Sequence, residues 1–323
     1  MMKKIYFLIC LLFLGFSSYA SHIVGGEITM RHAPVVGNVN SYIITLRYFR
    51  DKSGGPLVPS SLIGGINQKS NGASKLSITA NLIPPIFDIQ YDDEDCVPNN
   101  ILQEVEVGIL STIRLTLLPS NYNSATGYYI WFEDFARNQG IVNYAGDNTD
   151  AQYYMEFPSL ALYPGYDSPK FNKDPITFAL EGKQFKQNYL ATHLDNDSLS
   201  YDIVSPLLPG TNGQADTPVP FNLGYSLVFN YLNSLPSDAL EMINALNGDI
   251  AFTPLISGKY LFAIRVSHYD PITNVKIGEI RREFQFQVFE NTESPPIASD
   301  DQNSTTRIEY EFFAEEDREV RFT

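Results

Sequence analysis

The sequence predicts an all-β protein that consists of two tandem β-sandwich domains. Short segments in which apolar and polar residues alternate follow one another along the chain, and turn residues separate them. Aromatic residues make up 13% of the chain and charged residues 18%, a balance that disfavours long disorder and coiled coils. At 323 residues the chain is long enough for two domains that each bury a core of their own.

Residues 1–20 have the pattern of a cleaved secretory signal peptide. Lys3 and Lys4 precede an apolar run over residues 5–16, and residues 18–20 (SYA) form a small-x-small cleavage site. The run is shorter than the roughly 20 residues that cross a membrane, and no later segment is long enough. We therefore expect Sec-dependent export to the extracellular space or the outer cell surface, and no transmembrane segment beyond the signal peptide.

Residues 21–162 are expected to form the N-terminal β-sandwich domain. The clearest strand covers residues 41–50, where Tyr42, Ile44 and Leu46 lie on one face and Thr45 on the other. Short strands at this spacing are typical of a sandwich and not of a βαβ fold. The expected strands of this domain cover residues 22–31, 41–50, 75–82, 103–110, 113–118, 128–135 and 153–157.

Residues 163–290 are expected to form the second β-sandwich domain, after a junction over residues 158–174 that is rich in Pro, Gly, Tyr and Asp. A short helical insertion is expected over residues 236–246, because Asp238 and Glu241 have capping-box spacing. Residues 291–323 are interpreted as a linker followed by the incomplete start of a further module. The expected strands cover residues 176–180, 199–205, 225–231, 250–253, 258–267 and 278–288.

Charge and cysteine content restrict the partners. The formal net charge is -15, which argues against nucleic acid and against anionic membrane surfaces as ligands. The chain has two cysteines, and Cys10 leaves with the signal peptide, so Cys96 has no partner for an intrachain disulfide. We expect Cys96 to be an unpaired thiol, with pairing to another molecule as the alternative.

No catalytic constellation is recognised, and we expect the protein not to be an enzyme. Residues 23–26 (IVGG) and 51–58 (DKSGGPLV) resemble pieces of trypsin-like proteases, but they lie too close together and no suitable general base stands between them. Residues 128–132 (YYIWF) could stack sugars, although their alternation favours a core strand. The acidic run at residues 92–95 is interpreted as a solvated loop and not as a glycosidase acid and base.

The acidic turn at residues 195–197 is the one candidate metal site. Asp195 and Asp197 place two carboxylates within one turn, which is how calcium ligands are usually clustered. Calcium takes six to eight oxygen ligands, so backbone carbonyls, water, Asp202 or Asp270 would have to complete the site. The alternative is an acidic β-turn whose side chains hydrogen-bond to their own backbone.

An ordered series of motifs covers nearly the whole mature chain to about Val288. It consists of residues 22–29 (HIVGGEIT), 48–51 (YFRD), 137–143 (RNQGIVN), 195–201 (DNDSLSY), 248–254 (GDIAFTP) and 278–283 (GEIRRE). This series resembles large secreted proteins of gliding bacteria, which often carry a type IX sorting domain at their far C-terminus. Lys52 and residues 135–136 stand where the family usually has cysteines, and His193 stands where its acidic turn usually begins with Asp, which weakens the calcium expectation. No C-terminal sorting domain is recognised.

This resemblance implies immunoglobulin-like or cadherin-like sandwich modules exported to the cell surface, with roles in adhesion or gliding motility. We therefore expect a secreted, non-enzymatic structural or adhesion module whose partner is a surface protein or a polysaccharide. A carbohydrate-binding or carbohydrate-active protein is the main alternative, favoured by the many aromatic and acidic residues. A periplasmic assembly or scaffold protein is the third.

Overall fold

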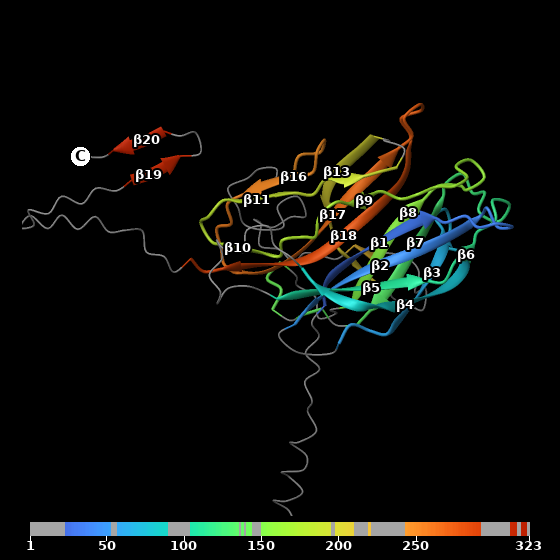
Figure 1. The fold of residues 1–323 in the computed structure, drawn as a ribbon, viewed down its shortest axis with the longest axis horizontal. Coiled ribbons are helices and arrows are strands. Elements are labelled where there is room, and N and C mark those ends of the chain that lie inside the picture. Colours follow the sequence, from blue (N-terminus) through green and yellow to red (C-terminus); the bar gives the residue numbers. More distant parts are fainter. Residues whose placement is uncertain are drawn as a thin grey trace, which may run out of the picture. The chain divides into compact units, whose positions relative to one another are not determined.

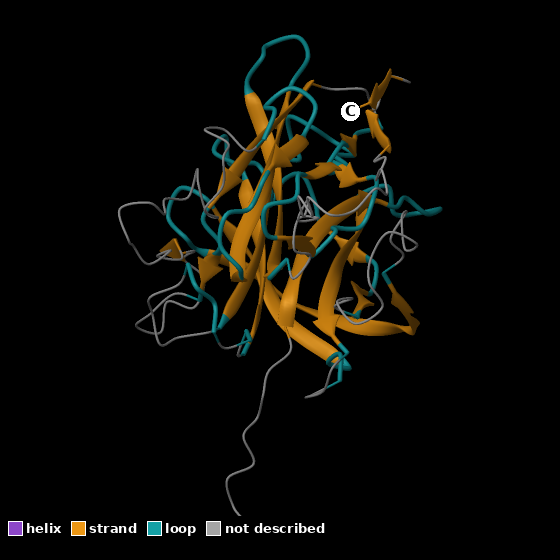
Figure 2. Ribbon diagram, turned by 90° about the vertical axis from the view of Figure 1, so that its left-hand side faces the viewer, coloured by secondary structure: helices purple, strands orange, loops and turns teal. Residues whose placement is uncertain are grey.

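The computed structural model describes residues 23–52, 57–89, 104–135, 137–138, 140–143, 150–194, 198–209, 219–220, 243–291, 311–314 and 318–321 (Figure 1). The chain divides into two compact units, residues 1–290 and 291–323. Every regular element in the described ranges is a β-strand, as the sequence predicts, and Figure 2 shows strands joined by loops. These ranges contain no helix of the length and apolarity needed to cross a membrane.

The described residues of the first unit form eighteen strands, most of them in one large sheet. Their alternating burial follows from alternating apolar residues, as predicted. The strands are β1 Ile23–His32, β2 Ser41–Asp51, β3 Ser61–Gln68, β4 Ser74–Asp88, β5 Val105–Thr112, β6 Leu115–Thr116, β7 Tyr128–Asp134, β8 Ala151–Phe157, β9 Lys170–Phe171, β10 Phe178–Leu180, β11 Phe185–Asn188, β12 Ala191–Thr192, β13 Ser198–Val204, β14 Leu207–Leu208, β15 Val219–Pro220, β16 Asp249–Phe252, β17 Gly258–Tyr269 and β18 Lys276–Phe289.

The N-terminal strands form a closed ring with β18. Antiparallel pairing runs in the order β1-β2-β5-β4-β3-β7-β8, and β18 pairs with both β8 and β1. One edge of β18 pairs with three strands in turn. Glu279 and Ile280 pair with β8, residues 282–284 pair with β1, and residues 287–289 pair with β10. The other edge of β18 pairs with β17 along almost its whole length. β18 is therefore shared between the two halves of the unit.

The second half of the unit is arranged around β17 and β18. β13 pairs antiparallel with β17, β17 with β18, and β10 runs parallel to β18. β11 and β16 form a separate antiparallel pair. A group of aromatic rings joins these layers, since Phe185 and Phe252 lie 5.2 Å apart and Phe185 lies 4.9 Å from Phe286. These rings belong to one large buried cluster that also includes the N-terminal strands.

The boundary expected between residues 162 and 163 is crossed by the sheet. β1 and β8 precede it, β18 follows it, and they are hydrogen-bonded to one another. The expected junction over residues 158–174 packs closely against both halves: Ser168 bonds to Met30, and the Lys173 carbonyl accepts a hydrogen bond from Arg282. Nearly all the strands predicted for residues 22–157 are present, and β3 is the one that the sequence pattern missed.

Two glycines explain why the alternation of side chains does not predict β3. Gly64 and Gly65 interrupt the alternation of side chains, but they are buried and allow β7 to approach, since a Cβ at Gly64 would overlap the carbonyl oxygen of Trp131. In the second half, β13, β16, β17 and β18 match their predicted positions within a few residues. The expected strand at residues 225–231 lies outside the described residues, as do the first seven residues of the expected helical insertion. Its last four residues, 243–246, are described and form a β-bridge at Ile243 and the start of a turn, so the helix expected there is not present in them.

In the second unit the described residues 311–314 and 318–321 form an antiparallel pair, β19 Glu311–Ala314 and β20 Arg318–Arg321. Glu311 is the register partner of Arg321, and Ala314 is the partner of Arg318. Two strands alone are marginally stable in water. The expected signal peptide, Cys96 and most of the expected linker lie outside the described residues.

Candidate functional site

The predicted calcium ligands Asp195 and Asp197 lie outside the described residues. The two acids expected to complete their site are described, and both have other partners. Asp202 pairs with Arg265 at 2.7 Å, and Asp270 accepts hydrogen bonds from the backbone of Ile272 and from Thr273, which lower its pKa. Calcium binding therefore stays a prediction. Calorimetric titration of residues 21–290 with calcium tests this prediction. The absence of a heat of binding at millimolar calcium would contradict calcium binding.

Several of the sequence motifs converge at the contact between β1 and β18, which we call the β1–β18 seam. Gly25 and Gly26 allow the two backbones to approach: a Cβ at Gly25 would overlap the Glu283 carbonyl oxygen, and a Cβ at Gly26 would lie 2.7 Å from the ring of Tyr153. Glycine is therefore required at both positions by packing. The seam joins motifs that are more than 250 residues apart in sequence, and Glu27 with Arg282 illustrates this.

A buried ion pair lies at the centre of the seam. The Nε atom of Arg282 donates to Glu27 Oε2 at 2.5 Å, and each side chain is only 1% exposed. Arg282 also donates to the Lys173 carbonyl at 2.7 Å, and its guanidinium lies 4.0 Å from the ring centroid of Phe171. Arg47 adds a second cation 3.4 Å from Glu27. Such pairs are costly to desolvate and hold their position only when both partners remain.

A second buried pair fixes loops on the opposite face of β18. Arg137 binds Glu283 through two hydrogen bonds of 2.6 and 2.8 Å, and it also donates to the carbonyls of Leu207 and Asp150. The adjacent Asn138 donates to Gln285 at 2.9 Å. These contacts satisfy the guanidinium donors and hold the segment around β14 against the sheet. The Arg-Asn motif therefore joins strands and loops within the protein.

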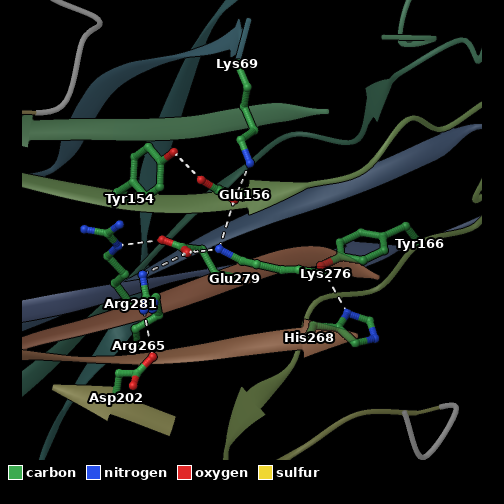
Figure 3. A network of polar contacts seen from close by, with 10 residues as sticks. All are labelled: Lys69, Tyr154, Glu156, Tyr166, Asp202, Arg265, His268, Lys276, Glu279 and Arg281. Carbon is green, nitrogen blue, oxygen red and sulfur yellow. Dashed lines mark hydrogen bonds and ion pairs between the residues drawn. The ribbon is translucent and has the colours of Figure 1, made fainter. Parts of the chain in front are cut away.

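A charged row crosses the outer face of the sheet from β13 to the turn after β3 (Figure 3). Glu279 is almost fully buried in this row, at 1% side-chain exposure, and pairs with Arg281 at 2.6 Å and with Lys276. Burial opposes ionisation of Glu279, but Arg281 and Lys276 outweigh it and lower its pKa. The other members of the row are Asp202, Arg265, Glu156 and Lys69.

The aromatic strand at residues 128–132 divides between two faces. Tyr128, Ile130 and Phe132 are fully buried in the core, as the alternation predicts. Tyr129 and Trp131 point to the opposite face, where they form a small cluster with Tyr154 and Leu207. A cavity beside this cluster measures ≈ 10 Å³, about the space of one water molecule, and its lining includes Tyr154 and Leu207. That cavity is too small to hold a substrate.

The described residues contain no group of three His, Cys, Asp or Glu side chains arranged to hold a metal ion. The chain was compared with protein-family models, with curated proteins and with solved structures, and none of these comparisons found a match. The sequence motifs contain Glu27, Arg137, Arg282 and Glu283. Only the fold reveals that Glu27 meets Arg282 and that Arg137 meets Glu283. The position of Trp131 on the outer face is the feature that the sequence pattern did not distinguish from the core.

Proposed function

We propose that this protein is a secreted, non-enzymatic structural or adhesion module of the cell surface, related to the gliding-motility-associated proteins of type IX secretion. The observation that supports this proposal is the use made of the motif residues. Arg137, Glu283, Glu27 and Arg282 bond to one another in pairs inside the fold, and do not converge on a cleft. Charged groups used in this way fix a shape, and these four side chains are engaged with one another and not with a ligand site.

We further propose that residues 163–290 form an immunoglobulin-like or cadherin-like sandwich. Four pairings support this assignment: β11 with β16, β13 with β17, β17 with β18, and β10 parallel with β18. They match the B–E, C–F–G and A′–G pairings of such sandwiches. Residues 21–162 form the partner module in this proposal, and β18 belongs to both.

The cellular part of the proposal is tested by surface labelling. Intact cells that produce the protein are treated with a protease or a biotin reagent that does not cross membranes, and the protein is then followed by immunoblotting. We expect labelling of the mature chain and no labelling of a periplasmic control protein. Recovery of the protein only in the periplasmic fraction would overturn the surface assignment and favour a periplasmic scaffold.

The adhesion part is tested in a strain that lacks the protein. We expect reduced attachment to glass or reduced spreading on agar, with recovery when the wild-type chain is restored. A matched strain producing the Arg282→Met variant should recover poorly, because the seam is broken. Normal attachment and spreading of the deletion strain would contradict an adhesion or motility role.

A further inference from the structure

The outer face of β7 carries the chain's single tryptophan, Trp131. It is partly exposed, whereas Tyr128, Ile130 and Phe132 on the same strand are buried in the core. A large aromatic side chain that remains partly exposed on a sheet is a common anchor for ligands. The surroundings of Trp131 determine whether it serves this purpose.

The indole ring of Trp131 is held flat against the neighbouring strand. Its register partner on β3 is Gly65, and a Cβ at Gly65 would lie 2.8 Å from Nε1 and 3.0 Å from two ring carbons. Nε1 donates to Oδ1 of Asn67 at 3.2 Å, and Asn67 in turn donates to the Gly72 carbonyl at 3.0 Å. The absence of a side chain at Gly65 thus allows the ring to rest on the backbone, and Asn67 fixes its orientation before any ligand arrives.

Other aromatic and polar groups flank the ring. Tyr129 and Tyr154 stack with their centroids 5.4 Å apart, and the Arg281 guanidinium lies 4.9 Å from the centre of the Tyr154 ring. The Tyr154 hydroxyl donates to Glu156 at 2.8 Å, and Lys69 pairs with Glu156 at 2.6 Å. Figure 3 shows Lys69, Tyr154, Glu156 and Arg281 close to one another around β8. Tyr129, Tyr154 and Glu156 are themselves buried. Trp131 is therefore the partly exposed ring of the cluster, and Lys69 and Arg281 are the partly exposed polar groups beside the cluster.

Sugars match this combination of groups. A pyranose ring presents a face of C–H groups that packs on an aromatic ring, while its hydroxyls bond to polar side chains at the edge. Nucleic-acid bases also stack on aromatic rings, but the net charge of -15 repels a polyphosphate. The charged row beside the ring contains four cations and three carboxylates, so this face does not repel neutral or weakly acidic chains.

We propose that Trp131 is the stacking platform of a polysaccharide-binding site on the outer face of β7 and β8, with Lys69 and Arg281 as the polar rim. The site would give the proposed surface module a ligand class. It does not depend on that function, because binding is measured on the purified chain and surface exposure is measured on cells.

Fluorescence of the purified mature chain tests the site directly, because the single tryptophan makes the emission specific to Trp131. The probes are hexasaccharides of cellulose, chitin, xylan and mannan, together with an alginate oligosaccharide. We expect at least one probe to change the emission saturably, with a Kd between about 10 μM and 1 mM, and to protect the ring from quenching by acrylamide. No change with any probe at 10-fold above that range would overturn the proposal, and so would a ring that acrylamide cannot reach.

Variants distinguish this site from any other. In calorimetric titrations with the active probe, Trp131→Ala should weaken binding more than about tenfold, and Trp131→Phe should weaken it less. Arg281→Gln should also weaken binding of the probe, although the Trp131 ring is still present in this variant. The matched control is Phe87→Ala, because Phe87 is an aromatic residue of β4 that is 52% exposed and lies outside the cluster. Unchanged affinity in Trp131→Ala, or an equal loss in Phe87→Ala, would place the ligand elsewhere.

Discussion

Arg282 of β18 and Glu27 of β1 form a buried ion pair across 255 positions of sequence. Arg282→Met leaves the Glu27 carboxylate buried with Arg47 as its nearest cation, so we expect the free energy of unfolding to fall by about 3–5 kcal/mol. The measurement is urea denaturation followed by circular dichroism. Lys52→Met is the control, because the pair between Lys52 and Asp88 is exposed to solvent, which screens it.

The double variant Glu27→Leu with Arg282→Met sharpens this test. Removal of both charges leaves no unpaired group, so the double variant should be more stable than Arg282→Met alone. Equal midpoints for Arg282→Met and Lys52→Met would show that the ion pair does not stabilise the seam.

Gly25 makes the closest backbone approach in the seam. Gly25→Ala places a methyl group on the Glu283 carbonyl oxygen, so we expect a loss of about 3 kcal/mol or more in the free energy of unfolding. Gly37→Ala is the matched control, since nothing lies within 4 Å of a Cβ there and only its positive φ opposes alanine. That control should cost about 1–2 kcal/mol. A smaller loss for Gly25→Ala than for Gly37→Ala would contradict the close packing of β1 on β18.

The shared strand β18 makes the two halves of the first unit depend on each other. Residues 21–290 should therefore unfold in one calorimetric transition, with van't Hoff and calorimetric enthalpies in agreement. Two resolved transitions would instead indicate independent modules at residues 21–162 and 163–290. Expression of residues 163–290 alone gives a second measurement, and we expect a poorly folded or oligomeric product because the edge of β18 loses β1 and β8.

The lowered pKa of Glu279 predicts sensitivity to acid. Burial disfavours its charged form, but Arg281 and Lys276 lower the pKa below the ordinary 4.5. A carboxylate whose pKa is lower in the folded state stabilises the fold fully above that ordinary value, and this contribution is lost as the pH falls through the folded pKa. Glu279→Gln should lower the free energy of unfolding by about 1.5–3 kcal/mol at pH 7. The free energy of unfolding of this variant should also depend less on pH below 4.5 than that of the wild type.

Urea midpoints at a series of pH values between 7 and about 3 measure this effect. Glu104→Gln is the control, because the Glu104 side chain is 71% exposed. A pH dependence in Glu279→Gln as steep as that of the wild type would rule out Glu279 as a source of the acid sensitivity.

Local patterns predicted most of the strands because alternation is visible in a single segment. Residues 41–50 and 258–267 are examples, and both became long strands. β3 was missed because Gly64 and Gly65 carry no side chain to show the alternation, and their purpose is evident only beside Trp131. The division expected near residue 162 rests on the local composition of the chain. The pairing of β1 with β18 crosses this position, and local composition does not reveal contacts between segments so far apart.

The candidate site was less predictable than the fold. Alternation assigned residues 128–132 to a core strand, which is correct for Tyr128, Ile130 and Phe132. Alternation does not show what covers the other face of this strand. The outward position of Trp131 and its packing on Gly65 therefore could not be predicted from the local sequence. The partners of Asp202 and Asp270 could not be predicted either. Arg265 meets Asp202 only when β13 pairs with β17, and Thr273 meets Asp270 only once the turn has formed.

The position of β18 also sets an order of events during biosynthesis. β1 is the first of the described strands to leave the ribosome, yet one of its two edges stays unpaired until residues 282–284 have been made. Contacts over so long a sequence separation form slowly. If the chain is exported while still extended, this delay favours passage through the membrane before the ring can close, and folding would then be completed on the far side.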